Sequence, residues 1–285
     1  MGGVDRSLFW AGNRVGVLLV HGLGGTPLEL RSIARGLSAR GSTVLCCQLA
    51  GHCGSEADLL ATRWPDWYRS VETALAALEE RCSTIVVGGL SMGAILALRL
   101  AAAHPGRVHG LTLFAPTLWY DGWSIPWYRF LLKMFIKTSI AQRYRFAERE
   151  PYGIKDERIR AVVAGAMIAG KNDEAGIAHT PSRSIRELWR LVDTVKRDLS
   201  SIKAPALIVQ AREDDISALS NAVYLQRRLG GLVECVVLDD SYHLVTVDRQ
   251  RDVVIDRSAD FIGFVARKAG HVDENFEAEQ HIAAE

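Results

Sequence analysis

The chain has 285 residues, of which 48% are hydrophobic, and its formal net charge is +1. This length suits one α/β domain with an insertion or two small domains, and the balanced charge gives no indication of nucleic acid or an anionic membrane surface as a partner. No apolar stretch reaches about 18 charge-free residues and no secretory signal is recognisable, so we expect a cytoplasmic protein without a membrane span.

Short apolar runs alternate with longer helical patterns along most of the chain. We expect strands at residues 15–20, 43–48, 84–88, 108–114, 206–210 and 233–238, and helices at 27–40, 64–80, 91–104 and 218–229. Most of the apolar runs are nearly continuous, which is typical of strands that are buried on both faces. The order of the elements predicts an α/β fold with a mostly parallel central sheet and helices on both sides.

This alternation stops in the span 117–201, which is rich in aromatic residues and mostly helical in pattern, with no convincing strand. We interpret the span as a helical cap that is inserted between two parts of the core, residues 1–116 and 202–267. A set of ordinary crossover helices is the alternative. The last residues, 268–285, are polar and predict a flexible tail.

Residues 89–93 read Gly-Leu-Ser-Met-Gly and lie between an expected strand and an expected helix. The order strand, Gly-x-Ser-x-Gly, helix predicts a nucleophile elbow, a sharp turn that holds the Ser91 hydroxyl clear of the sheet. Gly89 and Gly93 come close together in such a turn, where a Cβ on either would clash. The alternative is a serine that only caps the helix after a glycine-rich turn.

A serine nucleophile needs a base to take its proton and a third group to orient that base. His243 follows the last expected strand, and Asp214 and Asp215 follow the strand before it. All of them therefore lie at carboxyl ends of strands, where the functional residues of a parallel sheet gather. The order Ser91, acid, His243 matches the Ser…Asp…His order of one common triad fold. Of the two acids, Asp215 suits a solvated turn better.

Residues 21–27, His-Gly-Leu-Gly-Gly-Thr-Pro, follow the first expected strand. Small residues in this loop let the backbone approach a developing oxyanion. We expect one N–H group of an oxyanion hole from Leu23 and the other from Met92, the residue after the serine. The loop does not match a dinucleotide-binding fingerprint, because Pro27 stands where the third glycine is needed.

Together these motifs resemble those of the α/β-hydrolases, in particular the bacterial carboxylesterase and monoacylglycerol-lipase-like group, over about residues 8–267. The matching segments are the oxyanion loop at 21–24, the elbow at 89–93, the acid loop at 209–214, and the histidine loop at 241–243 with the Val-Asp pair at 247–248. The resemblance implies the α/β-hydrolase fold and assigns the triad acid to Asp214.

Two positions depart from the pattern of this group. The group often has Gly-His-Gly-x-Ser after an early strand, where this chain has Cys53 after His52. The residue before the triad histidine is often glycine, and here it is Tyr242. We expect His52 to be structural although it lies near the pocket, and Tyr242 to narrow that pocket.

The resemblance implies a serine hydrolase that cleaves small-molecule carboxylic esters through an acyl-enzyme, without a metal or an organic cofactor. The aromatic cap favours hydrophobic acyl or polyester-type substrates, with contacts from His21, Trp119, Trp123 and Trp127. An acyl thioesterase would use the same residues. A peptidase would need a site for a charged terminus, and a non-catalytic binding protein of this fold usually lacks part of the triad.

Overall fold

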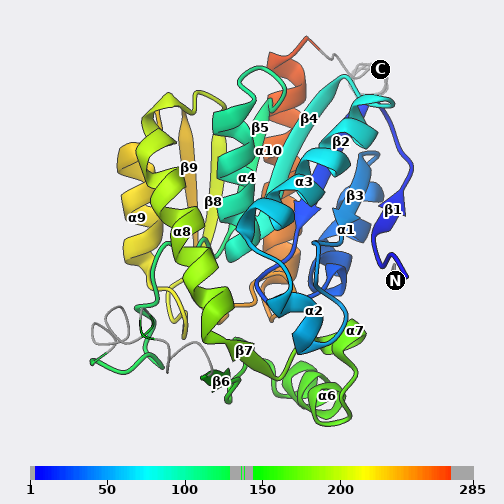
Figure 1. The fold of residues 1–285 in the computed structure, drawn as a ribbon. Coiled ribbons are helices and arrows are strands. Elements are labelled where there is room, and N and C mark those ends of the chain that lie inside the picture. Colours follow the sequence, from blue (N-terminus) through cyan, green and yellow to red (C-terminus); the bar gives the residue numbers. More distant parts are fainter. Residues whose placement is uncertain (1–3, 129–135, 137, 139–143, 271–285) are drawn as a thin grey trace.

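The computed structural model describes residues 4–128, 136, 138 and 144–270. Its centre is a seven-stranded sheet in the order β1-β3-β2-β4-β5-β8-β9 (Figure 1). β1 pairs antiparallel with β3, and every other neighbouring pair in the sheet is parallel. The strands are β1 (Leu8–Trp10), β2 (Val15–Val20), β3 (Thr43–Cys47), β4 (Thr84–Leu90), β5 (Gly110–Phe114), β8 (Ala206–Ala211) and β9 (Val233–Leu238).

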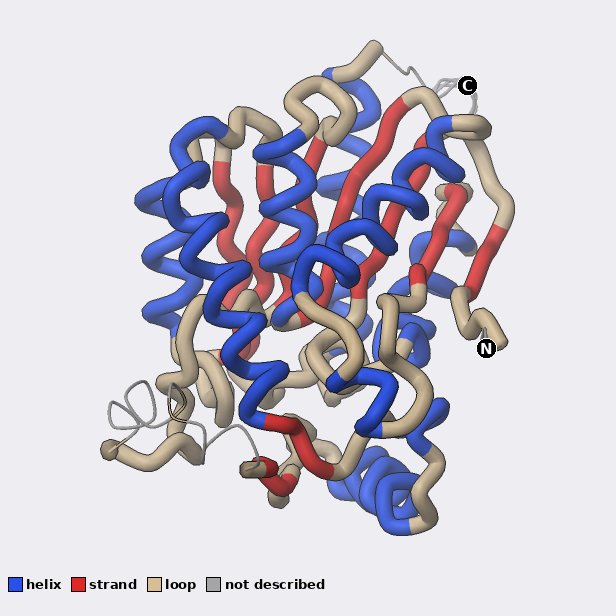
Figure 2. The backbone as a smooth tube through the Cα atoms, viewed as in Figure 1, coloured by secondary structure: helices blue, strands red, loops and turns tan. Residues whose placement is uncertain are grey.

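Helices cover both faces of the sheet, as Figure 2 shows for the whole chain. One face packs against α1 (Arg31–Ser38) and α10 (Arg251–Lys268), and the other against α3 (Trp64–Glu79), α4 (Met92–Ala103), α8 (Ser182–Asp198) and α9 (Leu219–Arg228). The remaining helical elements are η1 (Pro27–Leu30), α2 (Glu56–Leu60), α6 (Glu157–Ile168), α7 (Asn172–Ala175) and η3 (Leu199–Ser201). Among the described helices, none is long and apolar enough to cross a membrane.

Each strand and helix expected from the sequence forms close to its expected bounds. The continuous apolar runs of β2, β4, β5 and β8 are buried at every position, as expected for strands covered on both faces. β9 differs, because it is the last strand of the sheet and most of its residues are only partly covered. Because these strands run parallel, their carboxyl ends lie at the same edge of the sheet, where the loops that follow them come together.

The span 117–201 contains more of the core than the sequence indicates. A two-stranded antiparallel sheet of β6 (Arg145–Ala147) and β7 (His179–Pro181) forms in this span, where we expected no strand. After β7 the chain enters α8, whose buried face includes Leu188, Leu191 and Val195 and joins the same apolar cluster as α4. α8 therefore packs in the same helix layer as α4.

Two of the predictions concern, in part, residues that the structure does not describe. They are part of the expected cap, at 129–135, 137 and 139–143, and the expected tail beyond residue 270.

Truncation of α8 tests its place in the core. Leu191→Ala should lower the free energy of unfolding by about 2–5 kcal/mol, because it removes a fully buried side chain and leaves a cavity beside α4. The control is Ile168→Ala on α6, where the side chain is 87% exposed and the change should stay within about 0.5 kcal/mol. Chemical denaturation measures both. If both substitutions change the free energy of unfolding by the same small amount, α8 does not belong to the core.

Candidate active site

Ser91 lies between β4 and α4 with backbone angles φ 55° and ψ −113°, a region that residues other than glycine rarely adopt. The surrounding packing enforces this strained turn. A Cβ on Gly89 would overlap the backbone of Gly93, and one on Gly93 would overlap the carbonyl oxygen of Val20. The close approach of the two glycines that the sequence predicts is confirmed, and it sets the Ser91 side chain at the edge of the sheet.

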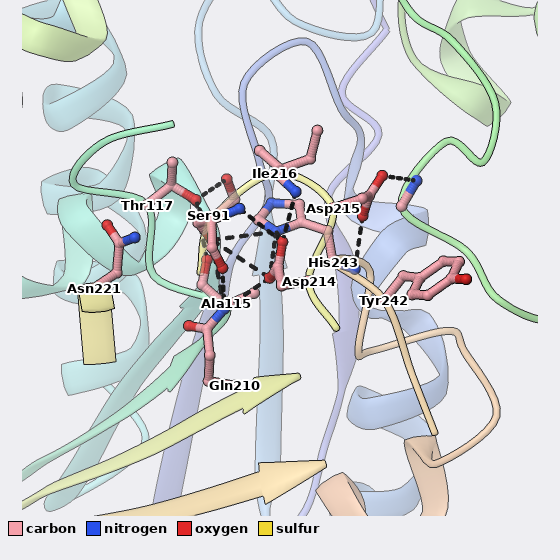
Figure 3. Close-up of polar contacts among 12 residues, drawn as sticks. Ser91, Ala115, Thr117, Gln210, Asp214, Asp215, Ile216, Asn221, Tyr242 and His243 are labelled. Atoms are coloured by element: carbon pink, nitrogen blue, oxygen red, sulfur yellow. Dashed lines mark hydrogen bonds and ion pairs between the residues drawn. The ribbon is translucent and has the colours of Figure 1, made fainter. Parts of the chain in front are cut away.

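The imidazole of His243 is in contact with the carboxylate of Asp214. The His243 Nδ1 lies 3.0 Å from one carboxylate oxygen and 2.9 Å from the other, and both side chains are buried (Figure 3). Since a carboxylate only accepts hydrogen bonds, the proton of the neutral ring is held on Nδ1 and the lone pair remains on Nε2. Ser91 belongs to the same group of side chains (Figure 3).

Asp214 is held by its own loop as well as by the histidine. One carboxylate oxygen accepts hydrogen bonds from the backbone N–H groups of Ile216 and Ser217, at 2.8 and 2.7 Å. The other accepts one from the Gln210 side-chain amide at 2.7 Å. These partners stabilise a charged carboxylate in a site without solvent. The sequence argument did not identify Gln210, although it is part of the acid-loop motif.

Asp215 is not in a solvated turn, and this expectation is wrong. Its side chain is buried, with 2% of the residue exposed, and it accepts hydrogen bonds from the backbone N–H groups of His243 and Gly153, each at 3.2 Å. Asp215 points away from the imidazole, toward the backbone of the histidine loop. Its role is to position His243 and to fasten a segment of the cap to that loop.

The Ser91 hydroxyl makes its hydrogen bond with Thr117, at 3.0 Å between the two oxygens. Among the described residues no hydrogen bond joins it to His243. Thr117 is fully buried and also contacts the carbonyl of Ala115 and the hydroxyl of Ser217, at 3.2 Å each. Sequence reasoning missed this residue, because a single threonine after a strand carries no recognisable signal.

Two backbone N–H groups near the elbow come from different segments, Leu23 in the loop after β2 and Met92 at the start of α4. Neither the N–H of Leu23 nor that of Met92 has an acceptor among the described residues. The loop after β2 is held by Glu29, whose carboxyl group accepts a hydrogen bond of 3.1 Å from the N–H of Gly22. A Cβ on Gly25 would overlap this carboxyl group, so the glycine allows the close approach.

His21 is held by the backbone on both sides of its ring. It is fully buried, its Nδ1 lies 2.9 Å from the Gly22 carbonyl oxygen, and its Nε2 accepts a hydrogen bond from the N–H of Leu49 at 3.2 Å. Burial, with a smaller contribution from His52, lowers the pKa of His21 to about 3, so the ring is neutral. His52 packs edge-on against His21 and Trp67, and burial lowers its pKa to about 4.

The three candidate tryptophans make their described contacts with residues other than Ser91. Trp119 donates a hydrogen bond to Asp121 and packs against Tyr224 of α9. Trp123, 58% exposed, donates to the carbonyl of Glu213 and packs against Tyr242. Trp127 is 80% exposed. None of the contacts described for these rings reaches Ser91 or His243, so a role in substrate binding gains no support. Tyr242 is turned toward Trp123.

The base of the cap is fastened to the histidine loop by a second buried carboxylate, Asp248. One of its oxygens accepts hydrogen bonds from the N–H groups of Tyr242 and Lys155, at 2.7 and 2.9 Å, and the other accepts one from Asp156 at 2.9 Å. At the start of the cap, the Ser124 hydroxyl donates to the carbonyl of Asp215 at 2.6 Å. The cap is therefore hydrogen-bonded to the loops that carry His243 and Asp214.

Glu29 gives the stability of the chain a dependence on pH. Burial raises its pKa to about 7, and the hydrogen bond from Gly22 only partly offsets this effect. The folded state therefore binds a proton more tightly than the unfolded state, in which the pKa is near its ordinary value of 4.5. As a result, the free energy of unfolding decreases as the pH rises from the unfolded-state pKa to the folded-state pKa of about 7. Glu29→Gln keeps an acceptor for Gly22 and should gain about 1–3 kcal/mol over the parent chain between about pH 5 and pH 8.

Urea denaturation at a series of pH values measures this gain. The control is Glu157→Gln on α6, where the carboxylate is 82% exposed and the difference from the parent chain should not vary with pH. Parallel stability curves for Glu29→Gln and the parent would show that the Glu29 carboxyl is not the titrating group.

The whole chain was compared with known proteins. The family model described as "Serine aminopeptidase, S33" (Hydrolase_4) matches residues 12–250. The thermostable monoacylglycerol lipase of Bacillus sp. (strain H-257) is 33% identical over 264 residues, which cover 92% of this chain and 95% of the lipase. The carboxylesterase of Bacillus subtilis (strain 168) is 26% identical over 242 residues, 84% of this chain and 88% of that enzyme.

A solved structure supports the same relationship. A metagenome-derived lipolytic enzyme, described in work on LipS and LipT, superposes with a TM-score of 0.77 at 28% identity and covers 90% of this chain and 96% of its own. The predicted α/β-hydrolase fold is confirmed. The chain belongs to the serine aminopeptidase S33 (Hydrolase_4) family of the α/β-hydrolases.

Proposed function

We propose that this chain hydrolyses small-molecule carboxylic esters through an acyl-enzyme on Ser91, with His243 as the base and Asp214 as the acid of a triad. The observation that carries the proposal is the buried contact between His243 Nδ1 and both oxygens of Asp214, beside a serine in a strained elbow. The names of the two Bacillus relatives, a monoacylglycerol lipase and a carboxylesterase, support ester bonds as the target.

The proposed proton transfer follows from the tautomer of His243. With Nδ1–H donated to Asp214, Nε2 is free to accept the proton of Ser91 as its oxygen attacks the ester carbonyl. The Ser91 hydroxyl first turns from Thr117 toward Nε2 by rotation about its Cα–Cβ bond. Burial opposes protonation of His243, but the Asp214 carboxylate, together with Asp215 and Glu29, outweighs it and the pKa of the ring is raised, which favours the imidazolium that forms.

The backbone N–H groups of Leu23 and Met92 are the proposed oxyanion hole. Both lack an acceptor among the described residues, and the Met92 group opens helix α4, where the helix dipole adds a partial positive charge. His243 then returns the proton to the leaving alcohol, and water releases the acid by the reverse sequence. No step uses a metal or an organic cofactor.

The acyl group itself is less sharply defined. The aromatic side chains that suggested a hydrophobic or polyester-type substrate are Trp119, Trp123 and Trp127, and their contacts do not support that role. A thioester would be attacked by the same groups, so matched ester and thioester substrates belong in the first assay. A cytoplasmic location stays a prediction.

Removal of the nucleophile is the direct test of the mechanism. Ser91→Ala should lower kcat for ester hydrolysis by on the order of a million-fold, because no other group can form the acyl-enzyme. A fluorophosphonate probe should label the parent chain and not this variant. The control, Ser200→Ala at an exposed position, should keep full activity and full labelling. Activity near that of the parent chain in Ser91→Ala would refute the acyl-enzyme route.

Substitution of the two neighbouring aspartates should have different effects on kcat. Asp214→Asn leaves the wrong histidine tautomer and should lower kcat by roughly ten-thousand-fold. Asp215→Asn has an amide facing the backbone N–H groups of His243 and Gly153, so it should lose about 1–3 kcal/mol of stability while kcat falls far less. Steady-state kinetics and denaturation on both variants decide this. If Asp215→Asn loses more turnover than Asp214→Asn, the acid of the triad must be reassigned.

A further inference from the structure

Four arginines converge on a surface cavity outside the proposed active site. Arg183, Arg186 and Arg190 lie on α8, Arg63 immediately precedes α3, and together with Glu187 they line a volume of about 310 Å³. α3 and α8 pack beside each other on one face of the sheet, and their N-terminal ends lie at the end of the molecule that carries the cap (Figure 1). None of the triad residues lines this cavity.

The positive charge in this cavity is largely uncompensated. Among the described residues, the guanidinium groups of Arg63, Arg183 and Arg186 make no ion pair and no hydrogen bond. The one acid of the cavity, Glu187, is buried and is paired with Arg190. A cluster of three free guanidinium groups carries repulsion that a bound anion would remove. The net charge of +1 for the whole chain hides this local excess.

One of these arginines also lies at the end of α8 where the helix dipole disfavours a cation. Arg183 is in the first turn of the helix, where the dipole is positive and acidic residues are favoured, and no acidic residue is present in that turn. The last turn has Lys196 and Arg197, as the dipole favours. Cationic side chains at the N-terminal end cost stability unless a negative group lies between them.

We propose that this cavity, formed by Arg63, Arg183, Arg186 and Arg190, binds a phosphate-bearing anion. Guanidinium groups present paired N–H donors that match the oxygens of a phosphate, and they remain charged at every physiological pH. The volume admits a phosphate group with a small substituent. The phosphate can be that of a free small molecule or of a lipid headgroup, and both present the same oxygens to the arginines.

Phosphate titration with a double variant tests the site. Calorimetric titration with inorganic phosphate, in a buffer without other multivalent anions, should show binding to the parent chain. Arg183→Gln/Arg186→Gln should weaken that binding by tenfold or more, since each charge-assisted hydrogen bond lost is worth about that factor. The control is Arg257→Gln on α10, on the opposite face of the sheet, which should bind phosphate like the parent.

Thermal unfolding adds a second readout, because the sign of the change in melting temperature distinguishes anion binding from a structural role of the arginines. Without anions, the double variant should melt at the same temperature as the parent chain or higher, because it loses positive charge near a helix N-terminus. Phosphate should raise the melting temperature of the parent chain and not that of the double variant. A double variant that melts lower than the parent without anions would assign the arginines to the fold and overturn the proposal.

Vesicles distinguish the two sources of the phosphate. Sedimentation with phosphatidylcholine vesicles, with and without phosphatidic acid, should show binding that needs phosphatidic acid and both arginines if a lipid headgroup is the ligand. Binding of inorganic phosphate without such sedimentation points to a free small molecule. If neither probe binds the parent chain, or if the double variant binds as well as the parent, the site does not exist. Hydrolysis of a soluble ester should be unchanged in the double variant, so this result is independent of the proposed triad.

Discussion

Buried carboxylates that accept hydrogen bonds from backbone N–H groups hold the loops at the carboxyl edge of the sheet together. Asp214, Asp215 and Asp248 are all buried, and each accepts hydrogen bonds from the backbone of at least one loop at the carboxyl edge of the sheet. A buried carboxylate without such donors would cost several kcal/mol, so the loops cannot move apart without exposing or protonating an acid. The orientation of His243 depends on this constraint, because Asp214 holds its ring and Asp215 its backbone.

The strained serine depends on a different kind of constraint, which is steric. Ser91 is held at φ 55° because α4 begins directly against β2, and only glycine at position 93 leaves room for the Val20 carbonyl. Strain of this kind costs of order 1–3 kcal/mol and persists only where the packing around it is tight. The packing comes from the centre of the sheet, where β4 lies between β2 and β5 and is fully buried.

The sequence alone predicted every strand of the central sheet except β1, the helices α1, α3, α4 and α9, and the pairing of Asp214 with His243, because apolar periodicity and short motifs encode local structure. It did not reveal that Asp215 is buried, since two adjacent acids in a turn look the same whether or not a neighbouring loop donates to them. Thr117 is hidden for the same reason, as its contacts with Ser91 and Ser217 join distant segments. The place of α8 in the core depends on packing partners, which periodicity cannot identify.

The hydrogen bonds that fasten the cap have a consequence for how this chain loses its structure. Asp215 and Asp248 each accept from the cap and from the histidine loop, through Gly153 and Lys155 on one side and His243 and Tyr242 on the other. Detaching the cap would leave both carboxylates buried without full partners. The base of the cap and the loop that carries His243 are therefore expected to open together, as one cooperative unit, when the chain is heated.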